Sequence, residues 1–196
     1  MGTFLFLVVV AGIAWVAYQA SQSRIGAKNQ KIAQTWSCLI QDGASQADRF
    51  FDQVRELIMS REIPGLKDRD IEVSDLKDEK LFSETRRFMV IRNSGTAKEF
   101  RIYVGVRPYG RELQVSWYLV VQPELASRVI SRLLTLGRGD RFAYAETLSV
   151  FAHQDLSAHA SVVHSCVKEV IQATMEKLGQ DFSKVDTRSK GVLELW

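Results

Sequence analysis

Apolar and polar side chains alternate along two consecutive stretches between residues 86 and 122. Apolar residues occupy every second position from 100 to 106 and again from 113 to 121. Residues 88–91 are rich in β-forming side chains, and residues 93–96 and 108–110 have turn chemistry. A period of two places alternate side chains on opposite faces of a strand. The pattern therefore predicts three antiparallel strands joined by short hairpins.

Helical spacing of apolar residues appears on both sides of these strands. It predicts an amphipathic helix over 46–62, preceded by a capping box of Ser45 and Asp48, and further helices over 125–136 and 157–178. The alternation in 71–76 predicts a short edge strand, with a solvated loop as the alternative, and the β-forming residues of 147–151 predict another strand. Together these elements predict an α+β fold: a two-layer domain in which helices pack on a mainly antiparallel sheet of three to five strands.

Residues 3–20 carry no charged side chain, and the first charge along the sequence is Arg24. A helix of this length spans roughly 27 Å, close to the ~30 Å hydrocarbon core of a bilayer. We expect residues 1–22 to form a transmembrane anchor. The alternative, a cleaved signal peptide, is disfavoured by the lack of Lys or Arg before the apolar run and by the poor cleavage site at 18–20. The anchoring side chains would be Phe4, Leu5, Val8, Ile13, Trp15 and Tyr18.

Basic residues follow the anchor, and none precedes it. Arg24, Lys28 and Lys31 lie within the window of the positive-inside rule. This asymmetry predicts a single-pass membrane protein with its amino terminus outside and residues 24–196 in the cytoplasm. Two cysteines, Cys38 and Cys166, suit a reducing compartment. In the opposite orientation, a disulfide between them would become possible.

Three further segments follow from the pattern. Residues 23–44 have apolar positions at helical spacing, which predicts a helical stalk or linker, although Trp36, Leu39 and Ile40 could instead pack on the domain. Residues 45–179 would form the soluble α+β domain. Residues 180–196 would form a polar tail whose apolar end either docks on the domain or serves as an interaction peptide.

Positive charge is concentrated in one part of the chain. The formal net charge is +3, but residues 86–141 hold eleven basic and four acidic side chains, and ten of the eleven are arginines. Arginine forms paired hydrogen bonds to carboxylates and phosphates and stacks on rings. This excess favours an anionic partner.

If the alternating apolar residues face the helices, polar and aromatic side chains share the other sheet face. Such a face could bind an acidic protein surface, and it could also bind nucleic acid or anionic lipid. An ordinary solvated face is the alternative. The candidate binding face consists of Arg87, Arg101, Tyr103, Arg107, Gln114 and Tyr118.

Catalytic and metal-binding motifs are not recognisable in the sequence. His159 and His164 would lie ~140° apart on one helix, and His164 and Cys166 ~160° apart, so that helix alone cannot surround a zinc ion. Residues 137–141 lack the ending of a P-loop. We therefore expect no cofactor, no metal and no enzymatic activity, with an enzyme whose site is not recognisable from the sequence as a further alternative. The sequence favours a membrane-anchored protein-binding or assembly module, with a tethered binder of nucleic acid or anionic lipid as the alternative, and leaves the oligomeric state open.

Overall fold

The computed structural model describes residues 31–77, 85–92, 95, 98, 100–121, 149–188 and 190–191. The chain divides into two compact units, and everything below concerns the unit made of residues 29–75 and 86–196. Within the described ranges, no helix is both long enough and apolar enough to cross a bilayer. The expected membrane anchor over 1–22 lies outside the described residues.

A six-stranded sheet, ordered β2-β3-β4-β5-β1-β6, forms one layer of this unit. Pairing is antiparallel between β3 and β4, β4 and β5, β5 and β1, and β1 and β6. The three hairpin-connected strands and the edge strand are confirmed, and the sheet has one strand more than the expected maximum. The strands are β1 (Lys31–Ile40), β2 (Ile71–Lys77), β3 (Thr85–Arg92), β4 (Phe100–Tyr109), β5 (Glu112–Val121) and β6 (Lys190–Gly191).

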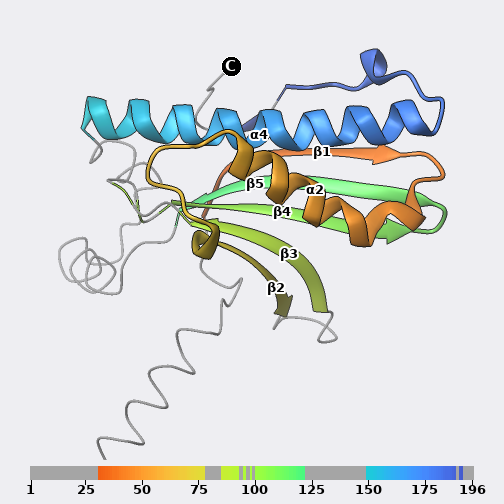
Figure 1. Ribbon diagram of the computed structural model, residues 1–196, viewed down its shortest axis with the longest axis horizontal. Coiled ribbons are helices and arrows are strands. Elements are labelled where there is room, and N and C mark those ends of the chain that lie inside the picture. Colours follow the sequence, from red (N-terminus) through yellow and green to blue (C-terminus); the bar gives the residue numbers. More distant parts are fainter. Residues whose placement is uncertain are drawn as a thin grey trace, which may run out of the picture. The chain divides into compact units, whose positions relative to one another are not determined.

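Two helices, α2 (Ala47–Ser60) and α4 (Val150–Lys177), lie on the same side of the sheet (Figure 1). The apolar face of α2 buries Phe50, Val54 and Ile58 in one core with the alternating side chains of the strands. The predicted α+β architecture and the amphipathic helix are thus confirmed. The capping box is wrong, because Ser45 lies in a 3-10 turn (Ala44–Gln46) and no side chain caps α2.

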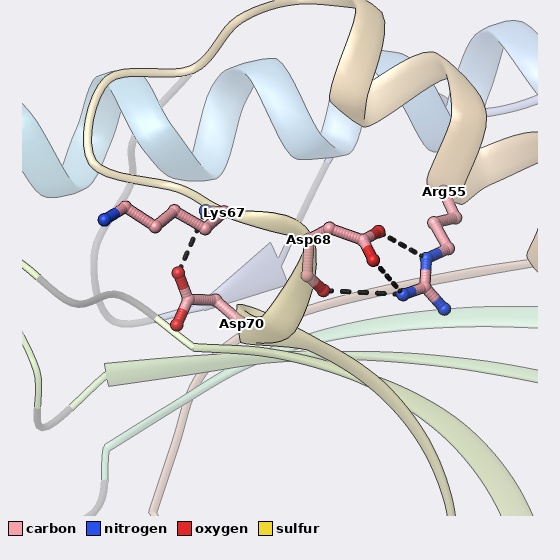
Figure 2. A network of polar contacts seen from close by, with 4 residues as sticks. All are labelled: Arg55, Lys67, Asp68 and Asp70. Atoms are coloured by element: carbon pink, nitrogen blue, oxygen red, sulfur yellow. Dashed lines mark hydrogen bonds and ion pairs between the residues drawn. The ribbon is translucent and has the colours of Figure 1, made fainter.

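The connection from α2 to β2 is held by an ion pair and a short turn. Arg55 Nε and Nη2 donate to Asp68 Oδ1 and Oδ2, each at 2.8 Å, as Figure 2 shows. In the same turn, the backbone N–H of Lys67 donates to Asp70 Oδ2 at 2.9 Å, and the Asp70 N–H donates to the Lys67 carbonyl oxygen at 2.8 Å. The paired hydrogen bonds from Arg55 lower the pKa of the Asp68 carboxyl. These contacts direct the chain from the helix into the edge strand.

Residues 31–40 form β1, so the helical stalk predicted over 23–44 is wrong for this part. Trp36, Cys38 and Ile40 pair with Trp117, Val115 and Leu113, and Trp36 and Ile40 are buried in the helix-facing core. The prediction failed because the apolar residues at 32, 36, 39 and 40 belong to both faces of a strand, and their combined spacing imitates that of a helix. Residues 23–30 lie outside the described residues.

Helix α4 begins earlier than its pattern indicated. Ser149 is its N-cap and accepts a hydrogen bond from the Ala152 N–H at 3.1 Å, so the strand predicted over 147–151 is wrong from residue 149 onward. Val150 and Phe151 are exposed, which is why the apolar helical stripe starts later. The helix predicted over 125–136 lies outside the described residues.

Part of the predicted tail packs on the domain. Phe182 and Val185 contact the core, and the Trp36 indole N–H donates to the Asp186 carbonyl oxygen at 2.6 Å. Gln180 exchanges hydrogen bonds with the backbone N–H and carbonyl of Gln41, at 3.2 and 2.6 Å. Residues 192–196 lie outside the described residues.

Candidate functional site

The sheet face opposite the helices presents side chains in rows that cross the strands. One row pairs Leu39 with Gln114 and Gln114 with Arg107. The antiparallel register, continued by two residues on each strand from Phe88 and Gly105, places Arg86 opposite Arg107 and adds it to this row. We call the four residues Leu39, Gln114, Arg107 and Arg86 the binding row.

The adjacent row consists mainly of small residues. Ser37 pairs with Ser116, Ser116 with Gly105, and Gly105 with Phe88. A Cβ added to Gly105 would lie 2.6 Å from both Phe88 Cε1 and Ser116 Oγ, so these side chains already occupy the space above the glycine. The glycine thus leaves room for the Phe88 ring to pack against β4.

A small hollow lies between the binding row and Tyr118. Its cavity volume is about 40 Å³. Gln114, Arg107 and Arg86 border it on one side, and Tyr118 borders it on the other. Arginines at the border of the hollow have the chemistry to pair with an anionic group, because a guanidinium matches the planar geometry of a carboxylate.

The Arg107 guanidinium is held in position by two neighbours. Its Nε donates to Gln114 Oε1 at 2.6 Å, and its Cζ lies 5.3 Å from the centre of the Tyr109 ring. The hydrogen bond fixes the orientation of the guanidinium plane, and the ring provides a cation–π contact. A positioned guanidinium loses less conformational entropy when it binds a ligand than a mobile one does.

The structure brings four of the six candidate residues to the same hollow and separates the other two from it. Arg87, Arg107, Gln114 and Tyr118 border the hollow. Arg101 lies six residues before Arg107 on β4, which corresponds to roughly 20 Å along an extended strand. Tyr103, a member of the candidate binding face, is only 2% exposed and offers little surface to a partner. Its cross-strand partners are Val90 and Tyr118.

Arg87 was assigned to the wrong face. It shares the alternation of Met89 and Ile91, which lie in the helix-facing core. Its guanidinium meets Asp48 of α2 at 3.8 Å and Asp75 of β2 at 3.7 Å. Its position in β3 still makes it border the hollow, but its charge is directed to these carboxylates. Residues 88–91 are all apolar, so alternation could not show which arginine lies on which face.

The hollow is also bordered by Arg86, Phe88 and Ser116, which the candidate set did not include. Strand pairing brings them together, because cross-strand neighbours are distant in sequence. Gly105 offered a usable signal: a glycine in the middle of an otherwise regular strand indicates a close approach of neighbouring atoms.

Two histidines of α4, His159 and His164, are buried in the core. The His164 ring stacks on Trp117, with centroids 5.0 Å apart and an angle of 28° between the planes, and meets Trp36 edge-on at 5.3 Å. Burial, and secondarily Lys168, lowers the pKa of His164 to about 4, and burial lowers the pKa of His159. In the described ranges, no group of three or more His, Cys, Asp or Glu side chains could hold a metal ion.

Both cysteines are free thiols, of which Cys166 is buried and Cys38 is half-buried. Burial raises the pKa of Cys38 to about 12 and also raises the pKa of Cys166. A thiol with a raised pKa is a poor nucleophile near neutral pH. Neither cysteine therefore has the environment of a reactive thiol.

No protein-family model matches the chain, and no curated protein and no solved structure matches it significantly.

Proposed function

We propose that this is a single-pass membrane-anchored protein whose folded domain binds an acidic surface of a partner protein and thereby tethers or assembles that partner at the membrane. The observation that carries the proposal is the hollow bordered by Arg107, Arg86 and Gln114. The uncharged run over residues 3–20 supports the anchor.

The chemistry of the hollow favours a carboxylate over a nucleic-acid strand. Single-stranded nucleic acid is usually held by aromatic rings that stack on successive bases. Tyr103 is buried, Tyr118 is half-buried, and Arg101 lies at the far end of its strand. A compact arginine-bordered hollow suits one or two carboxylates better than a chain of phosphates.

A photo-crosslinking experiment tests the partner class directly. Tyr109 is 62% exposed and contacts Arg107, so a photoreactive phenylalanine at position 109 would label a partner that binds beside Arg107. We expect adducts that contain protein. Adducts that contain only lipid or nucleic acid would overturn the proposal.

Two charge-reversal variants of the labelled protein provide the matched comparison. Arg107→Glu places a carboxylate in the hollow and should abolish the adduct. Arg49→Glu makes the same charge change at an exposed position of α2, on the helix side of the sheet, and should leave the adduct intact. Equal loss in both variants would show that only net charge matters.

A reporter at the carboxyl terminus tests the anchor and its orientation. We expect a cytoplasmic signal and a protein that remains in the membrane fraction after washing with high salt. A soluble protein, or a reporter on the outside, would overturn the corresponding part of the proposal.

A further inference from the structure

We infer that the domain docks on the bilayer with the end of the sheet at which β1 begins, and that this end binds anionic lipid headgroups. We call the four residues Ile32, Arg101, Val150 and Phe151 the docking end. The inference rests on the membrane anchor of the proposed function and adds a lipid-binding surface to it. It is carried by the exposed apolar side chains that two separate layers bring to one end of the domain.

The sheet contributes Ile32 and Arg101 from one row on the face opposite the helices. Ile32 pairs with Val120, and Val120 pairs with Arg101. Ile32 is 55% exposed, and Arg101 is half-buried. Among the described residues, no ion pair or side-chain hydrogen bond involves Arg101. Its guanidinium is therefore available to the phosphate of a headgroup.

The helix layer contributes the first two residues of α4. Val150 is 82% exposed and Phe151 is 78% exposed, which makes them the two most exposed large hydrophobic side chains of the described residues. The rest of the helix turns its apolar side chains toward the sheet. Neighbouring apolar side chains that project from the start of a helix suit insertion into the interfacial region of a bilayer.

The packing of α4 on β1 brings these two contributions to the same end. The His164 ring contacts Trp36, and Figure 1 shows that α4 and β1 run in the same direction. Val150 lies roughly 21 Å before His164 along the helix, and Ile32 lies roughly 13 Å before Trp36 along the strand. The start of α4 therefore projects past the row of Ile32 at this end of the domain.

The chain that precedes β1 ties the docking end to the membrane. Residues 23–30 separate the expected anchor from β1 and can span at most about 28 Å. They include Arg24 and Lys28 and no acidic residue. Basic segments next to a membrane helix are attracted to anionic lipid. The docking end is thus the part of the sheet that the chain holds nearest to the bilayer.

One acidic side chain limits how deeply this end can insert. Asp155 is exposed and lies one turn after Phe151 on the same side of α4. A carboxylate is unfavourable among acyl chains and is repelled by anionic headgroups. Insertion therefore stops at the first turn of the helix, about 5.4 Å deep.

Docking by this end leaves the hollow accessible to a protein partner. Arg107 lies roughly 20 Å from Arg101 along β4, on the side away from the bilayer. The lipid contact and the partner contact therefore occupy different parts of the same sheet face.

A photoreactive phenylalanine at position 151 tests the lipid contact. The full chain is reconstituted into vesicles that contain phosphatidylcholine and phosphatidylglycerol in equal amounts. The control carries the same label at position 109, which is also exposed and lies at the opposite end of β4. We expect about tenfold more lipid adduct at 151 than at 109 by mass spectrometry, because position 109 lies roughly 27 Å beyond Arg101 along the strand.

Two variants, measured with the label at position 32, assign the apolar and the cationic contacts. Val150→Ser combined with Phe151→Ser should lower the lipid adduct about tenfold, because these side chains lose their burial in the bilayer. A label that reached lipid only through the tether would not respond to changes in the other layer. Circular dichroism checks that the variants remain folded.

Arg101→Gln should lower the position-32 adduct by up to about fivefold in the mixed vesicles. In vesicles of phosphatidylcholine alone it should have no effect. The matched control is Arg49→Gln, at an exposed position of α2, which should change the adduct in neither kind of vesicle.

The outcomes separate this inference from the proposed function. Equal lipid adducts at 151 and 109, protein in place of lipid at 151, or a position-32 adduct unaffected by the serine pair would overturn the inference. An adduct unaffected by Arg101→Gln would overturn its headgroup contact. The proposed function is decided separately, by the protein adduct at 109 and its dependence on Arg107, and by retention of the chain in membranes after high salt.

Discussion

The imidazole of His164 on α4 stacks against the indole of Trp117 on β5, with ring centroids 5.0 Å apart. The stack joins the helix layer to the centre of the sheet. His164 is 5% exposed and Trp117 is 1% exposed, so the contact lies in the buried core. A buried histidine resists protonation, which makes the packing of the two layers sensitive to acid.

Stability should fall as the pH decreases from about 6.5 to 4. The pKa of His164 is about 4 in the folded chain and ordinarily 6.5, so the unfolded chain binds the proton first. The free energy of unfolding therefore decreases as the pH falls through this window, by about 3 kcal/mol in total. His159 contributes in the same direction. Urea unfolding at pH 7, 5 and 4 measures the slope.

His164→Phe assigns this slope to one side chain. Phenylalanine keeps an aromatic ring against Trp117 and does not titrate, so the variant should lose less stability than the wild type between pH 6.5 and 4. Identical slopes in the two proteins would contradict the role assigned to His164.

Gly105→Ala should destabilise the domain by about 1–3 kcal/mol through overpacking. The added Cβ would lie 2.6 Å from Phe88 Cε1 and from Ser116 Oγ, so at least one of these side chains must move. Thermal unfolding measures the loss. Adding Phe88→Leu and Ser116→Ala removes the conflicting atoms. The triple variant should therefore lose less stability than the sum of the losses measured for the three single variants. Strict additivity would argue against the clash.

Glu62→Gly should stabilise the domain by up to about 1 kcal/mol. Glu62 follows the end of α2 and has a φ of 49°, in the left-handed region that glycine adopts without steric cost. Chemical unfolding of the variant provides the measurement. The matched control is Glu56→Gly, at an exposed position inside α2, which should destabilise by about 1 kcal/mol. The same sign of change at both positions would contradict the argument.

Neither cysteine should react with a thiol reagent in the folded protein. The pKa values of Cys38 and Cys166 are raised by burial, so little thiolate forms at pH 8. Two thiols per chain should react after unfolding in guanidinium chloride. Rapid labelling of either thiol under native conditions would show that it is accessible.

The strands of the central hairpins could be predicted because alternation is a local property. Phe100, Ile102 and Leu113 mark the buried face without reference to any distant residue. The apolar face of α2 was predictable for the same reason, since its period of 3.6 residues lies within one segment. These signals were sufficient for the α+β class and for most of the sheet.

The sequence by itself determined the central hairpins and helix α2, because each carries its own period of burial. Only the tertiary structure decided that residues 31–40 enter the sheet beside β5, since their apolar side chains serve two faces. It also decided the site. Leu39, Gln114 and Arg107 become neighbours through cross-strand pairing, and pairing depends on register, which no single segment encodes.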